Sequence, residues 1–489
     1  MSELARDAQW QRLDRRMMLV HPVREVVRFL PVLIGLFVAG TAADGGQRSW
    51  QLLGVAVPVA LGLLRYLTTG FRITAGRVEL RRGLLNRHVL ATPLDRVRTV
   101  DLTAPPVHRL LGLTTVRIGT GTASTDEDDA LDLDGLPIER ARRLREELLR
   151  VSPDAEPEAG TAPARVVMRL DPSWVRFAPL TSSGLVIAAG VLGLGSQLLD
   201  TLGWPDRLRP GRVVEGAAGI GWWLGVPVVV VALLALVSTL AVVGYVVANW
   251  GFTLSHTPGA WHLSRGLLTT RETTLDEVRV GGVSLARPLG LRLVGGARLS
   301  AIVTGLAKQP GSAVLVPPAP LAAVRGTARE VLGRSAPVDV PLTGHGPRAR
   351  TRRWTRALAP ALLASAALVV LVVLDEGSAW WLVPAALLPP AGAALAADRV
   401  AALGHALADG HLVASSGSLD RRREMLSTDS VIGWTMRSTW FQRRAGLTSL
   451  VATTAGGRQR VVVLDVPEVD AVALAGRATP GLLDPFLAP

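Results

Sequence analysis

The stretch WWLGVPVVVVALLALVSTLAVVGYVVA, which runs from Trp222 to Ala248, contains no charged residue. About 20 mostly apolar residues in a helix are enough to cross the hydrocarbon core of a bilayer. A buried helix in a large soluble core is the alternative, but an uncharged run of this length makes that alternative poor. We therefore predict a transmembrane helix over residues 222–248.

Five other apolar blocks accompany this stretch, and the six blocks form three pairs. The pairs are 26–43 with 50–67, 178–199 with 222–248, and 357–374 with 378–397. Tryptophans lie at or near many of the block ends, where aromatic residues form belts at membrane surfaces. The predicted fold class is an integral membrane protein with six α-helical transmembrane segments in three pairs. Cleavage of the first block as a signal peptide is the weaker interpretation, because a second apolar block follows almost at once.

Arginine is distributed unevenly around these blocks. Six arginines lie between Arg6 and Arg28, and five lie between Arg348 and Arg356, at the starts of the first and fifth blocks. The short link within the first pair carries one arginine, and the link within the third pair carries none. The link within the middle pair carries three arginines, a mild departure from this pattern. The positive-inside rule therefore places the N-terminus, the C-terminus and both long segments between the pairs in the cytoplasm. We expect a multipass protein of the cell (inner) membrane.

Each pair of blocks is followed by a polar segment with alternating apolar residues, and these three repeats resemble one another. Each has two glycines seven positions apart and later an arginine before a Gly-Leu turn. Glycine supplies the positive φ angles that tight turns require. A proline and a helical pattern close each repeat, which predicts three cytoplasmic α+β modules, each an antiparallel β-sheet or barrel with a C-terminal helix. The turn glycines are Gly76, Gly83 and Gly112, then Gly259, Gly266 and Gly290, and finally Gly410, Gly417 and Gly446.

These features set the predicted domain organisation of the 489 residues, a length that allows roughly three domains. Residues 1–67 hold a leader and the first two transmembrane helices, 68–152 the first module, and 153–177 a linker. Residues 178–249 hold the next two helices, 250–335 the second module, and 336–356 a basic linker. Residues 357–398 hold the last two helices, and 399–489 the third module with a C-terminal tail.

This plan resembles the bacterial pleckstrin-homology-like (PH-like) membrane proteins of the YdbS/YdbT-like family. The resemblance rests on the paired turn glycines, the strand Leu94-Asp95-Arg96-Val97 and the turn Arg109-Leu-Leu-Gly112-Leu113, all placed after a helix pair. It is good in the first repeat, fair in the second and degraded in the third. It implies a small bent β-barrel capped by a helix in each module. It also implies that the protein has no catalytic residues and works with a shorter, one-module relative.

Motifs for catalysis, cofactors or metals are missing from the sequence. The chain has no cysteine, which excludes disulfides, thiolate metal sites and cysteine nucleophiles. Its sole lysine, Lys308, follows no glycine-rich phosphate loop, and no His-Glu-x-x-His or Gly-x-Ser-x-Gly motif occurs. The acidic run 126–129 invites a calcium interpretation, but Ala130 falls where the first ligand belongs, and a solvated hairpin tip is favoured. We predict no enzyme activity, no cofactor and no metal, with the histidine pairs His256/His262 and His405/His411 placed at turns.

The net charge of +13 gathers at predicted membrane edges. No stacking aromatics accompany the arginines, which argues against nucleic acid as a partner. The cluster before the fifth block sets topology and could also contact anionic lipid headgroups, at about 1 kcal/mol per residue near the surface. Its members are Arg348, Arg350, Arg352, Arg353 and Arg356.

The sequence therefore predicts a non-catalytic multipass membrane protein whose PH-like modules mediate protein–protein or lipid-headgroup binding. Its expected partners are membrane lipids and either a shorter one-module relative or a second copy of the chain. The family resemblance suggests envelope stress tolerance or resistance to membrane-active compounds as the process. The alternative is a transporter or export component for an apolar or peptide substrate. No ionisable residue lies deep in the six blocks, which argues against ion or proton coupling in such a transporter.

Overall fold

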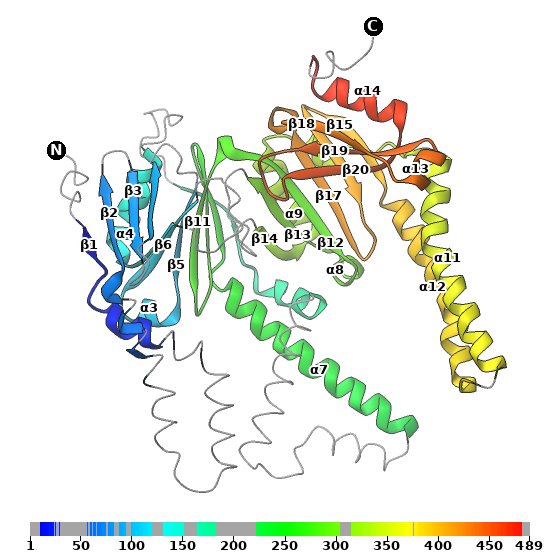
Figure 1. Cartoon of the computed structure of the whole chain (residues 1–489), viewed down its shortest axis with the longest axis horizontal. Helices are drawn as coiled ribbons and strands as arrows, with labels where there is room; N and C mark the ends of the chain where they lie inside the picture. Colours follow the sequence, from blue (N-terminus) through cyan, green and yellow to red (C-terminus); the bar gives the residue numbers. More distant parts are fainter. Residues whose placement is uncertain are drawn as a thin grey trace. The chain divides into compact units, whose positions relative to one another are not determined.

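The computed structural model places most of the chain in two compact units (Figure 1). The first unit is Met1–Glu277 with Gly305–Ala307, and the second is Val278–Thr304 with Lys308–Pro489. Each unit is described by itself below. The structure describes residues 10–23, 25, 29, 56, 59–60, 62–64, 66–74, 77–82, 88–93, 99–119, 131–150, 164–181, 222–303, 314–374 and 376–481.

The first unit contains two antiparallel sheets. A four-stranded sheet has the order β1-β2-β3-β4, with β1 (Gln11–Arg12), β2 (Gly70–Thr74), β3 (Arg77–Arg82) and β4 (His88–Pro93). A seven-stranded sheet has the order β7-β6-β5-β11-β10-β9-β8. Its strands are β5 (Thr99–Ala104), β6 (Leu113–Gly119), β7 (Leu131–Pro137), β8 (Arg165–Arg169), β9 (Thr253–Thr257), β10 (Ala260–Arg265) and β11 (Thr270–Asp276). The helices are α3 (Pro106–Leu110), α4 (Ile138–Arg150), the 3-10 helix η4 (Pro172–Leu180) and α7 (Trp222–Asn249).

Alternating side chains build the core of the first unit. In β7, Leu131 and Leu133 are buried, and they pack with Val116 of β6 and Phe71 of β2. The apolar face of α4, including Ala141, closes this core. Alternation in a strand and a period near four in a helix both direct apolar residues to one side, so the expected sheet with a C-terminal helix forms here.

The second unit also contains two antiparallel sheets. A six-stranded sheet has the order β14-β13-β12-β17-β16-β15, and a three-stranded sheet has the order β18-β19-β20. The strands are β12 (Val280–Pro288), β13 (Gly296–Val303), β14 (Val314–Pro320), β15 (Gly404–Ala408), β16 (His411–Ser416), β17 (Asp420–Ser427), β18 (Gly433–Arg437), β19 (Leu447–Thr453) and β20 (Arg460–Pro467). The helices are η6 (Glu277–Arg279), α8 (Leu289–Leu293), α9 (Leu321–Leu332), α10 (Ala336–Asp339), α11 (Gly346–Val373), η7 (Ala379–Trp381), α12 (Leu382–Ala401), η8 (Thr428–Ser430), α13 (Trp440–Arg444) and α14 (Glu468–Ala478).

The large sheets join strands from different sequence repeats. In the first unit, β5 of the first repeat pairs with β11 of the second, and Val100 lies opposite Thr274. In the second unit, β12 of the second repeat pairs with β17 of the third, and Val283 lies opposite Met425. The strands of residues 250–335 are therefore divided between two sheets, one in each unit. The repeat in the sequence does not correspond to three separate sheets.

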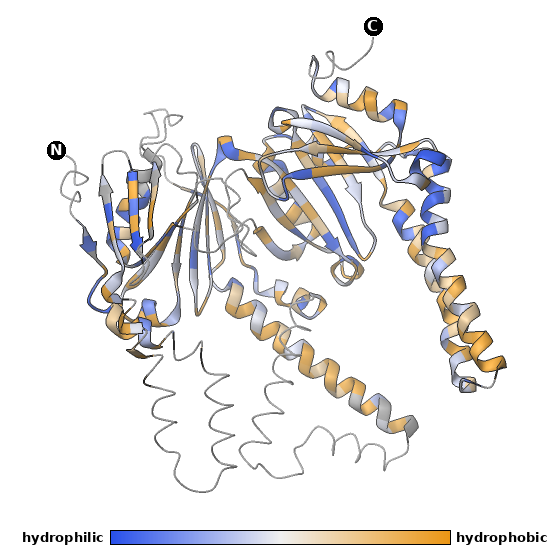
Figure 2. Ribbon diagram, in the orientation of Figure 1, coloured by the Kyte–Doolittle hydropathy of each residue, from blue (hydrophilic) through white to orange (hydrophobic). Residues whose placement is uncertain are grey.

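Three helices in the described residues are long and apolar enough to cross a membrane, and Figure 2 shows that hydrophobic residues predominate along much of their length. The qualifying segments are Val230–Asn249, Gly346–Val373 and Ala379–Ala401, which coincide with the predicted spans 222–248, 357–374 and 378–397. The predicted spans 26–43, 50–67 and 178–199 lie wholly or largely outside the described residues. α11 begins at Gly346, so the predicted basic linker continues directly into the apolar helix, with no break at residue 357.

One of the predicted turn glycines, Gly290, does not lie in a turn. Six of them, Gly112, Gly259, Gly266, Gly410, Gly417 and Gly446, have positive φ angles. Gly290 instead lies inside α8, and Gly295 takes the positive φ of 72° after that helix. In the second repeat the residue equivalent to Gly112 and Gly446 is therefore Gly295. The Gly-Leu turn predicted at Gly290 lies five residues before it. Gly76 and Gly83 lie outside the described residues.

Candidate functional site

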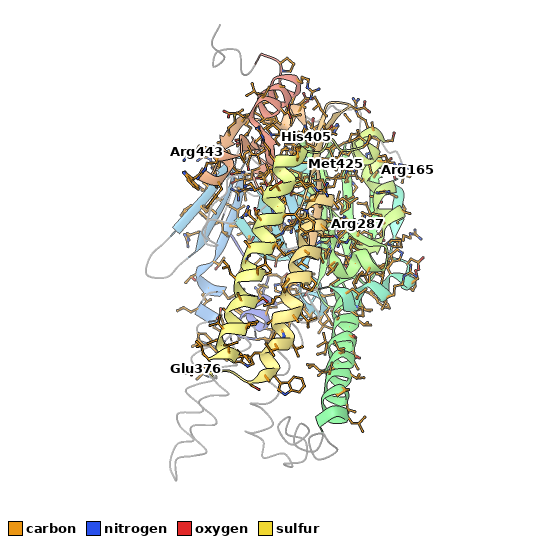
Figure 3. All side chains as sticks on the ribbon, turned by 90° about the vertical axis from the view of Figure 1, so that its right-hand side faces the viewer. Arg165, Arg287, Glu376, His405, Met425 and Arg443 are labelled. Atoms are coloured by element: carbon orange, nitrogen blue, oxygen red, sulfur yellow. The ribbon has the colours of Figure 1, made fainter. Side chains whose placement is uncertain are left out.

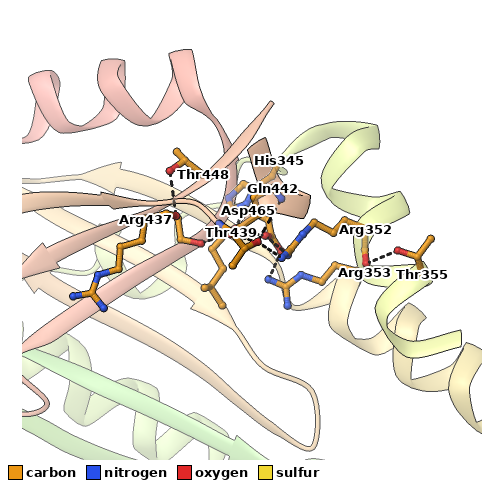
Figure 4. Close-up of polar contacts among 11 residues, drawn as sticks. His345, Arg352, Arg353, Thr355, Arg437, Thr439, Gln442, Thr448 and Asp465 are labelled. Atoms are coloured by element: carbon orange, nitrogen blue, oxygen red, sulfur yellow. Dashed lines mark hydrogen bonds and ion pairs between the residues drawn. The ribbon is translucent and has the colours of Figure 1, made fainter. Parts of the chain in front are cut away.

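The base of α11 is joined to the third repeat by an ion-pair cluster around Asp465 (Figure 4). Asp465, in β20, is only 1% exposed. Arg352 pairs with its Oδ1 atom, and Nη2 of Arg353 lies 2.6 Å from Oδ2. Both arginine side chains are themselves largely buried, at 10% and 12% exposed. One carboxylate therefore pairs with two guanidinium groups, which leaves one net positive charge at the point where helix α11 meets the sheet.

Neighbouring amides complete the environment of this carboxylate. Gln442 donates from Nε2 to Asp465 Oδ1 at 2.8 Å and is also 2.8 Å from Ser449 Oγ. Gln442 is fixed by a capping box with Thr439 at the start of α13. Asp465 adopts a positive φ of 56°, a conformation that Asp tolerates better than most residues. These contacts satisfy Oδ1 of Asp465, whereas the Nε atoms of Arg352 and Arg353 have no hydrogen-bond partner among the described residues.

Two buried histidines lie beside the Asp465 cluster. His345, immediately before α11, donates from Nδ1 to the carbonyl oxygen of Leu464 at 2.7 Å. With a neutral ring its Nε2 is then the acceptor for Nδ1 of His405, 2.9 Å away. Burial, and next the neighbouring His345, together lower the pKa of His405 from its ordinary value to about 4. The pair is therefore neutral at physiological pH and ties the start of α11 to β15.

The end of α12 is fixed by a second carboxylate, Asp398. Its Oδ1 lies 2.7 Å from Nη2 of Arg292 in α8 and 2.6 Å from Nη2 of Arg421 in β17. α12 also packs against α11, where Ser365 Oγ donates to the carbonyl oxygen of Ala385 at 2.6 Å. The α11–α12 hairpin is thus attached to the sheets both where it begins and where it ends.

Positive charge is in excess around Asp398. Arg287 of β12 lies directly opposite Arg421 in the sheet register. Burial and the nearby guanidiniums of Arg325, Arg292 and Arg421 all lower the pKa of Arg287. Like charges directly opposite each other destabilise a sheet, and the carboxylate of Asp398 offsets part of this repulsion by pairing with Arg292 and Arg421.

The first unit repeats the buried polar cluster with different residues. Asp134 of β7 accepts from Thr115 at 2.6 Å and pairs with His108 of α3 at 2.9 Å. Burial alone would raise the pKa of Asp134, but these two hydrogen bonds outweigh it and hold the pKa well below its ordinary value. His108 and Gln442 each lie four residues before a positive-φ glycine. His108 and Gln442 therefore occupy equivalent places in the first and third repeats, whereas the position equivalent to Asp465 is Gly135, next to Asp134.

The predicted lipid-contact arginines separate into two groups. Arg352 and Arg353 pair with Asp465, and their side chains are 10% and 12% exposed. Arg348, Arg350 and Arg356 are exposed. Asp465 was not predicted as the partner of these arginines, nor Gln442 as a partner of Asp465. One sequence feature marks the position of Asp465. It lies two residues before Pro467, which is the place that Gly135 occupies before Pro137 in the first repeat.

The residues weighed as metal ligands are used for hydrogen bonds in the structure. His256 lies 3.1 Å from Glu277, and His262 contacts the hydroxyls of Thr257 and Thr274. Asp132 forms a bidentate pair with Arg117, at 2.6 and 2.7 Å. Within the described part of the chain, no group of three or more His, Asp or Glu could hold a metal ion. The run 126–129 lies outside the described residues.

Comparison with known families identifies two regions of the chain. The model of the bacterial PH domain matches residues 26–152 and 357–476. Each match contains a predicted helix pair and the repeat that follows it. The second match includes Asp465 and Gln442 but not Arg352 and Arg353, which precede it. Residues 153–356 lie outside both matches. No curated protein and no solved structure shows a significant match.

Proposed function

The chain belongs to the bacterial PH domain family, and from that premise we propose that it is a non-catalytic membrane protein that holds binding modules at the membrane surface. The family is one of non-catalytic modules. In this proposal the PH-like modules bind a protein partner or lipid headgroups. The apolar helices supply the membrane attachment.

The observation that carries this proposal is the junction between α11 and Asp465. Arg353 lies four residues before Ala357, where the predicted span begins, so the junction is about 6 Å along the helix from the apolar part. Asp398 makes the corresponding attachment at the end of α12. A module attached at both ends of a helical hairpin keeps a fixed height and orientation above the bilayer. That property suits presentation of a binding surface more than catalysis.

The finer parts of the proposal concern topology and process. We propose six spans in three pairs, with both termini and the three repeats in the cytoplasm of a bacterial cell. The exposed residues Arg348, Arg350 and Arg356 beside the apolar part of α11 support this orientation, because positive residues favour the cytoplasmic side. Envelope stress tolerance or resistance to membrane-active compounds is the proposed process, on the family resemblance.

The experiment that tests the binding role is purification of the tagged full-length chain from cross-linked bacterial membranes. The proposal expects either a stoichiometric protein partner, such as a one-module relative or a second copy, or retained anionic lipid. A tagged, unrelated multipass protein is the control for background. Recovery of neither a partner nor anionic lipid above that control would overturn the binding role.

A transporter or export component is the second candidate. Its support is Pro389–Pro390 within α12, because prolines inside membrane helices are common in transporters with broken helices. Substrate flux in proteoliposomes that is lost on substitution of Pro389 and Pro390 would favour this function. Substrate flux equal to that of protein-free vesicles would exclude the transporter function.

A further inference from the structure

Two short helices of the second unit expose large apolar side chains. In α13, Phe441 is 71% exposed and Trp440 is also exposed. In α8, Leu293 is 77% exposed, and Leu289 and Val294 are exposed beside it. Exposed apolar groups that cluster in this way mark a binding surface more often than isolated ones do.

Both short helices are attached to the ends of the α11–α12 hairpin. Thr439, at the start of α13, accepts from Nη2 of Arg352 at 3.5 Å. Arg292 of α8 pairs with Asp398 near the end of α12. In Figure 1, α8 lies at the end of β12 and β13 toward which the hairpin extends, whereas α14 lies on the opposite side of this unit. The two apolar surfaces therefore flank the hairpin.

The depth of these helices matches the headgroup layer. Arg352 lies five residues before Ala357, which is about 7.5 Å along the helix from the start of the apolar span. Asp398 lies one residue beyond the predicted end of the last span at 397. Side chains on α13 and α8 are therefore within reach of the boundary between headgroups and acyl chains, where interfacial helices insert to about 5–10 Å.

The chemistry of the surfaces suits an anionic bilayer. The Trp440 and Phe441 rings contact each other edge to face at 5.0 Å, and the guanidinium of Arg444 lies 4.8 Å from the Trp440 ring centroid. Aromatic and aliphatic residues flanked by arginine are typical of membrane-surface anchors. The excess positive charge near Arg287 and Arg292 complements lipid phosphates.

The first unit contains the same arrangement independently. Leu110 of α3 is 86% exposed. The adjacent Arg109 donates to the carbonyl oxygen of Leu267 at 2.6 Å, and the Leu267 amide donates to Val247 near the end of α7. A short helix with an exposed leucine thus again lies beside the end of a long apolar helix, α7.

We infer that α13 and α8 insert their exposed apolar side chains into the headgroup region of the anionic bilayer that α11 and α12 cross. This inference rests on the proposed function, because it takes those two helices to span the membrane. The third repeat then has an interfacial attachment in addition to its transmembrane one.

The test uses single cysteines, because the chain has none of its own. Full-length Phe441→Cys, Leu363→Cys and Val469→Cys variants are labelled with an environment-sensitive fluorophore in phosphatidylcholine–phosphatidylglycerol vesicles. Quenching is measured with lipids that carry a spin label high on the acyl chain. Leu363, in α11, reports membrane insertion of the helix, and Val469, an exposed apolar residue of α14, is the matched control.

We expect the Phe441→Cys and Leu363→Cys probes to lose about half or more of their fluorescence, and the Val469→Cys probe to lose little, since only an inserted group meets the quencher. Quenching at position 363 with none at 441 overturns the interfacial inference and leaves the proposed function intact. Absence of quenching at 363 overturns the proposed function itself. A blue-shifted probe at 441 that lipid does not quench shows burial against protein, which also overturns the inference.

Discussion

Asp465 and Arg353 form a buried ion pair of 2.6 Å between the last strand of the third repeat and the base of a membrane-type helix. Arg352 shares the same carboxylate. The two arginines lie in the segment that the sequence marks as a topology signal. They therefore have a structural role that their position in a basic cluster conceals.

The Asp465→Asn substitution tests the strength of this junction. It removes the charge that compensates two buried guanidiniums, and breaking a buried pair in this way costs about 3–5 kcal/mol. We expect a clearly lower melting temperature for the detergent-solubilised protein. The control is Asp339→Asn, which breaks the exposed Arg329–Asp339 pair and should cost about 1 kcal/mol or less. Equal losses of stability in the two variants would show that the Asp465 junction contributes no more than an exposed ion pair does.

The Gly282→Ala substitution tests the pairing of β12 with β17. A Cβ at position 282 would lie 2.1 Å from the carbonyl oxygen of Met425, so the strands must separate, at a cost of about 1–3 kcal/mol. Gly326→Ala is the matched control, because nothing lies within 4 Å of its added Cβ in α9. We expect thermal unfolding to show loss of stability for the first variant and a gain of about 0.5–1 kcal/mol for the second. A stable Gly282→Ala variant contradicts the observed register.

Acid should weaken the attachment of α11 through His405. The pKa of His405 is about 4 in the folded protein and returns to its ordinary 6.5 on unfolding. The unfolded chain therefore binds a proton more readily in this window, so this contribution to stability is full above pH 6.5 and is lost as pH falls toward 4. Between pH 7 and pH 5 the loss is about 2 kcal/mol.

The His405→Asn variant isolates this effect. Asn keeps an N–H donor for His345 but does not titrate near neutral pH. The difference in unfolding free energy between pH 7 and pH 5 should shrink by about the same 2 kcal/mol in the variant. An unchanged pH dependence would assign the acid sensitivity to other groups, such as His262, whose pKa is also lowered by burial.

The exposed arginines of α11 should account for part of the lipid retention. Combined substitution of Arg348, Arg350 and Arg356 by Gln removes about 1 kcal/mol of headgroup attraction per residue, and mass spectrometry should detect less phosphatidylglycerol bound to the purified protein. The control variant carries Gln at three exposed arginines elsewhere in the second unit, Arg458, Arg460 and Arg477. If both triple variants retain lipid equally, the lipid role of the α11 arginines is excluded.

Local features of the sequence were sufficient to predict some elements. The uncharged run 222–248 predicted α7, and the alternating residues of Leu131–Leu136 predicted β7 and its buried face. The start of α11 was not predicted, because arginine is compatible with helix and composition marks only the apolar part. The helix begins at Gly346, whereas the predicted apolar block begins only at residue 357.

Long-range relationships were not predictable from a single sequence. Arg352 and Asp465 are 113 residues apart, and no periodicity links them. The pairing of β5 with β11 and of β12 with β17 depends on backbone edges, which carry no sequence signature beyond strand propensity. Repeats indicate similar local folds but do not determine which strand edges meet.

The most direct test of the central claim is cysteine accessibility in intact spheroplasts of bacteria that express the full chain. Glu376 lies at the tip of the α11–α12 hairpin, at the opposite end from His405 and Arg443 (Figure 3). We predict that Glu376→Cys reacts with a membrane-impermeant maleimide from outside the cell, whereas Val469→Cys reacts only after permeabilisation. Reaction of both variants before permeabilisation, or of Val469→Cys alone, would contradict a membrane protein that holds its third repeat on the cytoplasmic surface.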